Sequence, residues 1–109
     1  MAVSLFFDPV RLVLEVSECL WPEMECTVQY VSGLHDGEDA YGATDFPDDG
    51  STPRIQIDTC TPIEAAVEIL AHELAHVAAG PDAEHGEDWE RAFDAIFLMY
   101  HKRVQELAA

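Results

Sequence analysis

Residues 61–89 read TPIEAAVEILAHELAHVAAGPDAEHGEDW, and this stretch determines the expected fold. It opens with the pattern of a capping box, from Thr61 to Glu64, with a proline in the first turn. Gly80-Pro81 is typical of a helix end. Between these signals, apolar residues recur with helical spacing at Ile63, Val67, Leu70, Leu74 and Val77. The stretch therefore predicts a long amphipathic helix, followed by a turn and a further helix.

The rest of the chain supplies three short strands and two more helices. A first helix is expected over residues 9–20, after an aspartate cap and before Trp-Pro. Extended segments are expected at residues 26–32, 40–46 and 54–58, separated by turns rich in glycine and aspartate. The last helix is expected to begin near Gly86, with one face packed in the core: Trp89, Phe93, Ile96, Phe97, Tyr100, Val104 and Leu107. This order of elements predicts an α+β fold.

The long helix contains a pair of histidines with metal-ligand spacing, in His72-Glu73-Leu74-Ala75-His76. Residues four apart lie on one face of a helix, so both imidazoles can reach one ion. The glutamate between them lies beside the ion without binding it, where it can accept a proton from a metal-bound water. Small residues accompany this face and allow another element to pack closely against it: Ala65, Ala75 and Ala79.

A catalytic zinc site takes three protein ligands and keeps one position open for water. His85, in the turn after the helix, is the first choice for the third ligand. Glu90 is an alternative, with Asp94 as the partner that orients it. Other acidic residues crowd the same turn and are alternatives too: Asp82, Glu84, Glu87 and Asp88.

The segment HELAHVAAGPDAEHGEDW resembles the zincin metallopeptidases, most closely the SprT-like branch, whose pattern is HExxH, a variable spacer and HGxxW or HGxxF. The matching positions are His72, Glu73, His76, His85, Gly86 and Trp89. The resemblance implies a small zincin-like domain in which one zinc ion is bound by the three histidines and Glu73 is the general base. A minimal gluzincin-like peptidase is the second choice, because Glu90 to Asp94 resembles the ExxxD of that branch. Metzincins fit less well, since Asp82 stands where their third histidine is expected.

These observations predict a zinc metalloendopeptidase that hydrolyses peptide bonds of protein substrates, with Glu73 activating a zinc-bound water. The peptide is expected to pair with an exposed sheet edge, for which residues 40–46 are the choice. The glycine in this segment, Gly42, indicates a bulge or a close backbone approach. Several residues are of the type that stabilises an oxyanion, and the sequence does not choose among them: Tyr30, Tyr41, Tyr100, His35 and His101.

Length and charge limit the function further. The 109 residues make one domain, residues 1–109, and 22 acidic against five basic residues give a net charge of −17. Such a field opposes direct binding to nucleic acid. The favoured interpretation of the acidic surface is that it keeps the protein in solution, and the alternative is selection of a basic peptide or protein as substrate or partner. No apolar run is long enough to span a membrane, and no convincing signal peptide is present, so a cytoplasmic location is expected. Three cysteines, Cys19, Cys26 and Cys60, are expected as buried thiols in a reducing compartment.

Two other classes of function are consistent with parts of the sequence. One is an acidic interaction protein that mimics nucleic acid, which accounts for the charge but not for the HExxH helix. The other is a zinc-binding module without catalytic activity, for which replacing Glu73 would change nothing but metal content.

Overall fold

The computed structural model describes residues 7–34 and 41–108, and its elements follow the expected order. They are α1 (Pro9–Leu20), β1 (Thr27–Val31), β2 (Gly42–Asp45), β3 (Arg54–Asp58), α2 (Ile63–Ala79) and α3 (Glu87–Ala108). The predicted α+β class is thereby confirmed, with three helices and a three-stranded mixed sheet in the described residues. Each predicted strand agrees with the structure to within two residues, although residue 40 lies outside the described part.

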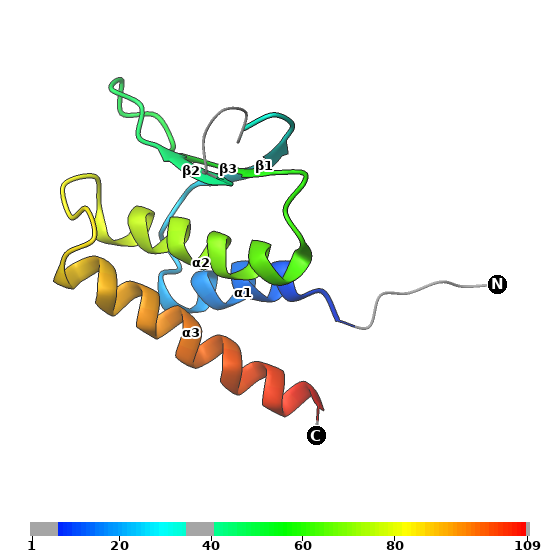
Figure 1. The fold of residues 1–109 in the computed structure, drawn as a ribbon. Coiled ribbons are helices and arrows are strands. Elements are labelled where there is room, and N and C mark those ends of the chain that lie inside the picture. The colour runs from blue at the N-terminus through cyan, green and yellow to red at the C-terminus, as the bar shows by residue number, and fades with distance from the viewer. Residues whose placement is uncertain (1–6, 35–40, 109) are drawn as a thin grey trace.

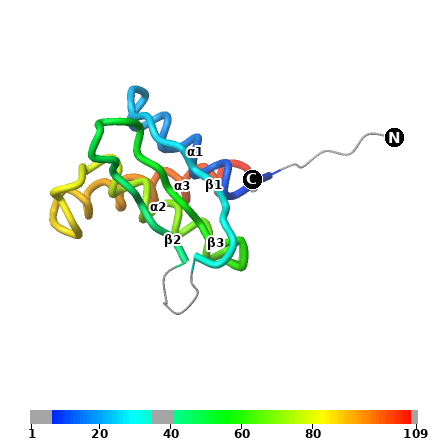
Figure 2. Tube along the Cα trace, turned by 90° about the horizontal axis from the view of Figure 1, so that it is seen from above, coloured from blue at the N-terminus to red at the C-terminus, as the bar shows by residue number. Residues whose placement is uncertain are grey.

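The sheet has β3 at its centre, between β1 and β2 (Figure 2). β1 runs parallel to β3, and β2 runs antiparallel to it, so that Ile55 pairs with Val28 on one side and with Thr44 on the other. β2 is therefore an edge strand, as expected for this segment. A Cβ atom at Gly42 would collide with the Cγ2 atom of Ile69 on α2, which confirms a close backbone approach at this position.

α2 lies between the sheet and the other two helices (Figure 1). Its apolar residues Leu70 and Leu74 are fully covered, and they form one core with Ile55 and Ile57 of β3. Burial of these side chains is the main stabilising contribution to such a domain. None of the described helices has both the length and the apolar character that crossing a bilayer requires.

α1 begins where the sequence predicts it. Asp8 is the N-cap, and its Oδ1 atom accepts hydrogen bonds from the backbone N–H groups of Val10 (3.1 Å) and Arg11 (3.3 Å). The helix ends before Trp21, whose N–H donates to the carbonyl of Ser17. Val13 and Val16 are buried and contribute to the core.

The prediction of a capping box at the start of α2 is wrong. The helix begins at Ile63 with Pro62 as its N-cap, and no side chain caps it. Pro62 keeps an extended ψ of 147°, and the residue before a proline is also held out of the helical region. Thr61 is therefore one position too early to cap, and its Oγ1 atom is buried without a hydrogen-bond partner among the described residues. The turn is organised instead by Asp58, whose carboxylate accepts from the N–H of Cys60.

Two residues expected on buried helix faces are exposed. Ile63 is the first residue of α2 and borders an open groove beside Pro9 and Tyr100, so it is 66% exposed. Leu107 is 45% exposed because it lies in the last turn of α3, where this helix diverges from α2 (Figure 1).

The prediction that all three cysteines are buried is also wrong. Cys19, near the end of α1, accepts a hydrogen bond from Arg103 of α3 and Cys60 lies in the turn after β3, and both cysteines are exposed. Cys26 is half-buried beside β1, and burial raises the pKa of its thiol.

Candidate metal centre

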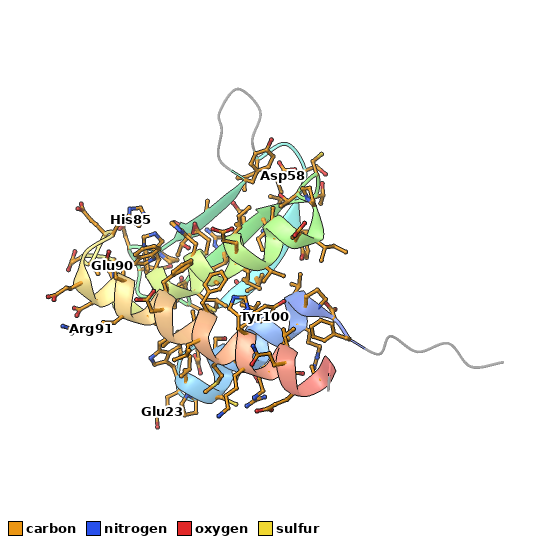
Figure 3. All side chains as sticks on the ribbon, turned by 60° about the horizontal axis from the view of Figure 1, so that its bottom comes forward. Glu23, Asp58, His85, Glu90, Arg91 and Tyr100 are labelled. Atoms are coloured by element: carbon orange, nitrogen blue, oxygen red, sulfur yellow. The ribbon has the colours of Figure 1, made fainter. Side chains whose placement is uncertain are left out.

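Three histidine side chains meet at the carboxyl-terminal half of α2. His72 and His76 lie one turn apart on α2, and His85 comes from the turn between α2 and α3 (Figure 3). The Nε2 atoms of His72 and His76 are 3.3 Å apart, and each lies 3.1 Å from the Nε2 atom of His85. The three nitrogens thus form a nearly equilateral triangle that has one atom from each ring.

This triangle has the size that a bound metal ion requires. Ligand nitrogens at 2.0–2.1 Å from a tetrahedral zinc ion are about 3.3 Å from one another. The three measured separations, 3.1–3.3 Å, agree with this value to within about 0.2 Å. The group could therefore hold a metal ion, and imidazole nitrogens suit several first-row transition metals.

The turn that carries His85 depends on unusual backbone conformations. Gly80 ends α2 with a φ of +96°, a value that L side chains rarely adopt, and Glu84 has a φ of +49°. The N–H of Gly86 donates to the carbonyl of Ala83 at 2.9 Å, and a Cβ atom at residue 86 would lie only 3.1 Å from that oxygen. The glycine therefore permits the tight turn that directs His85 back toward α2.

Trp89 connects the metal centre to α3. Its indole Nε1 atom donates to the backbone carbonyl of His72 at 3.1 Å, and its ring lies 4.8–5.7 Å from the three histidine rings. Phe93, one turn further along α3, stacks on Trp89 with the two ring centroids 5.1 Å apart. Trp89 is half-buried against the core, as the sequence predicts for this face, but its hydrogen bond to the histidine backbone was not predicted.

Glu73 is 7% exposed and points toward the sheet rather than into solvent. The hydroxyl of Thr44, on the edge strand β2, donates to its Oε2 atom at 2.7 Å. This contact gives a buried carboxylate a hydrogen-bond partner and limits its orientation. The sequence did not indicate Thr44, because its position opposite Glu73 depends on how β2 packs on α2.

The environment of His76 favours the form that binds metals. Burial lowers the pKa of His76 below its ordinary value, the Glu73 carboxylate acts in the opposite direction, and repulsion from His72 and His85 adds to the lowering. A histidine binds a metal ion through a neutral ring. His76 is thus available as a ligand at a lower pH than an isolated histidine.

A cleft of about 290 Å³ adjoins the histidines on the side of the sheet. It lies between β2 and α2, and its lining residues are Gly42, Ala65, Glu68, Ile69, His72 and Glu73. Ala65, expected on a face covered by another element, is instead exposed here, whereas Ala75 is fully buried. The histidine group is therefore open on the side where β2 forms an edge of the sheet in the described part of the chain.

The acidic alternatives for the third ligand do not join the histidine group in the part of the chain that is described. Glu87 and Asp88 instead form exposed ion pairs with Arg91 at 3.4 Å and 3.7 Å. Glu90 lies with Arg91 at the start of α3 (Figure 3), and it too is exposed. Asp82 and Glu84 are likewise exposed in the turn.

The candidates for stabilising an oxyanion are spread over the molecule. Tyr30 is on β1, at the opposite edge of the sheet from β2. Tyr100 and His101 lie near each other several turns along α3. Tyr41 directly precedes Gly42, which lines the cleft. His35 lies outside the described residues.

Comparison of the chain with known protein families, with curated proteins and with solved structures found no match.

Proposed function

We propose that this protein is a zinc-dependent metalloendopeptidase. The observation that carries the proposal is the triangle of three Nε2 atoms with Glu73 next to it on the same helix. The resemblance of the HExxH and HGxxW positions to SprT-like zincins supports the same activity. Zinc is the proposed metal, because three imidazoles with an open side are typical of catalytic zinc.

The Nε2 atoms of His72, His76 and His85 would hold the ion. When bound, zinc supplies a Lewis acid that polarises the scissile carbonyl and lowers the pKa of water to about 7. The three imidazoles would bind the ion as neutral ligands. The cleft adjoins His72 on the side of β2, where water and substrate would enter. Trp89 keeps the backbone of His72 in place through its hydrogen bond to the carbonyl.

Glu73 is the general base in this proposal. Its carboxylate accepts a proton from the attacking water and later returns it to the leaving amine. The Thr44 hydroxyl donates to the Oε2 atom and thereby limits the orientation of this carboxylate. Because Glu73 directly follows His72, its backbone position relative to His72 and His76 is fixed by one helix.

The edge of β2 is the proposed binding site for the peptide. An extended substrate that pairs with the unpaired side of Gly42–Asp45 would lie along the cleft, next to His72 and Glu73. Main-chain hydrogen bonds would then place a peptide bond near the metal centre, whatever the side chains of the substrate.

The first test is the zinc content of the purified chain, measured by elemental analysis without added metal. We expect about one zinc per chain, because a catalytic zinc site takes three protein ligands and the three histidines make one such site. We expect nearly none in His72→Ala. No zinc in the parent chain, and none taken up near pH 7, would overturn the proposal and favour an acidic interaction protein.

The second test separates a peptidase from a zinc-binding module. Peptide hydrolysis is measured for the zinc-loaded parent and for Glu73→Gln, which keeps the shape of the side chain. We expect hydrolysis by the parent only, with equal zinc in both. Zinc binding without hydrolysis by either protein, across a broad set of peptides, would indicate a module without activity.

A further inference from the structure

We infer that the cleft between β2 and α2 is a subsite for a lysine or arginine side chain of the substrate, with Glu68 as the carboxylate that recognises its charge. This inference rests on the proposed peptidase function and specifies the class of substrate. It is carried by the size and lining of the cleft, by the charges that line it and by its position beside the candidate metal centre.

The cleft, called the slot below, has a size that suits one long side chain. Its volume of about 290 Å³ is at the lower limit of small-molecule sites, which occupy about 300–1,000 Å³. Gly42 and Ala65 contribute almost no side chain, and the half-buried Ile69 supplies an apolar wall. The methylene groups of a lysine or arginine pack favourably along such a surface while the charged end remains in water.

The charge of the slot is negative, and within residues 7–34 and 41–108 no basic side chain pairs with it. Glu68 is exposed, and none of the ion pairs between described residues includes it. All five basic residues of the chain lie in the described part, and none of them lines the slot. Arg11, Arg54 and Arg91 pair with other carboxylates. A substrate cation would therefore be the partner that Glu68 lacks.

The slot is adjacent to the site of the proposed reaction. Glu68 and His72 are one helical turn apart, which corresponds to about 6 Å along the axis of α2. Glu73, the proposed base, lines the same slot as Glu68. A side chain bound there belongs to a residue at or next to the peptide bond that is cleaved.

The test uses the zinc-loaded full chain and two matched sets of alanine-rich octapeptides. In one set a single lysine is moved through every position; in the other, acetyl-lysine takes its place and keeps the length without the charge. We expect lysine to be preferred at one position by about twofold to fivefold in kcat/KM, the range of a partly exposed ion pair. Glu68→Gln should abolish the preference, and Glu68→Lys should favour glutamate at that position.

Glu64 provides the matched control. It lies one turn before Glu68 on the same exposed side of α2, and it does not line the slot. Glu64→Gln and Glu64→Lys make the same changes in net charge and should leave the preference within about twofold of the parent, as expected for an exposed charge outside the slot. A loss of preference in these variants equal to that in the Glu68 variants would show that overall charge decides, and would overturn the assignment.

A binding measurement distinguishes failure of this inference from failure of the proposed function. The affinity of the same peptides, labelled with a fluorophore, is measured by anisotropy for the zinc-loaded Glu73→Gln chain and for its Glu68→Gln counterpart. Preferential binding of lysine that depends on Glu68, without hydrolysis by the parent, would support the slot and contradict the peptidase. Hydrolysis with equal use of lysine and acetyl-lysine would support the peptidase and overturn the slot.

Discussion

The contact between Thr44 and Glu73 is the residue-scale feature that most affects the proposed chemistry. A carboxylate that acts as a base must be held at a fixed position, and Glu73 is fixed by one helix and by one hydroxyl from the sheet. Loss of a partner that orients a group in a metal site typically reduces activity or metal affinity about 10- to 100-fold.

We expect Thr44→Val to lower kcat for peptide hydrolysis by about tenfold, because the methyl group that replaces the hydroxyl cannot donate to Oε2. Thr44→Ser retains the hydroxyl and should restore most of kcat. KM and zinc content should be similar in all three proteins. An equal loss of kcat in both variants would show that the strand packing, and not the hydrogen bond, is what matters.

Cys26 allows a prediction about pH. Burial raises the pKa of its thiol, and only the thiolate reacts with iodoacetamide. The measurement uses a chain that carries Cys19→Ser and Cys60→Ser, so that only Cys26 reacts. The pH at which its alkylation rate is half-maximal should be higher for the folded protein than for the same chain in urea. Identical midpoints would mean that the fold does not bury this thiol.

At the scale of the element, the start of α2 contains the clearest local defect. The Oγ1 atom of Thr61 is buried without a hydrogen-bond partner in the described structure, and Pro62 provides no side-chain cap. A buried hydroxyl without a partner lowers stability, because it loses its hydrogen bonds to water and gains none.

We expect Thr61→Val to raise the free energy of unfolding by about 1 kcal/mol, since valine has nearly the same shape and no group to leave unpaired. The measurement is urea denaturation of the parent and the variant. Thr52→Val, at an exposed position in the turn before β3, is the control and should change stability by less than about 0.5 kcal/mol. A variant less stable than the parent would show that the hydroxyl has a partner.

The elements themselves were largely predictable from the sequence, for identifiable reasons. The aspartate cap of α1 and the glycine that ends α2 act within one turn, so local patterns place these boundaries correctly. The HExxH spacing and the turn to His85 are also local, and the three rings meet as expected. By contrast, Thr44, the indole of Trp89 and the exposure of Ile63 depend on how separate elements pack, which spacing along the chain does not reveal.

For the whole molecule, we expect metal to contribute to stability. A ligand that binds only the folded chain stabilises it by about 2.7 kcal/mol at a concentration 100 times its Kd. The histidines come from α2 and from the turn that follows it, so an ion would join these segments in the folded state. Addition of zinc to metal-free protein should raise Tm in the parent chain, and EDTA should reverse the change. His85→Ala should respond much less, and an equal response would place the stabilising ion elsewhere.

The separation of these contacts along the chain has a consequence for synthesis of the protein. His72 and His85 are 13 residues apart, whereas Thr44 and Glu73 are 29 residues apart and belong to different layers. Closing a short loop costs less conformational entropy than closing a long one, and local contacts form sooner. A newly made chain with α2 and its turn already formed, but with β2 not yet docked, would therefore have its three histidines assembled while Glu73 still lacks its contact with Thr44. On the proposed function, the capacity to bind metal would then be acquired before the capacity to cleave peptides.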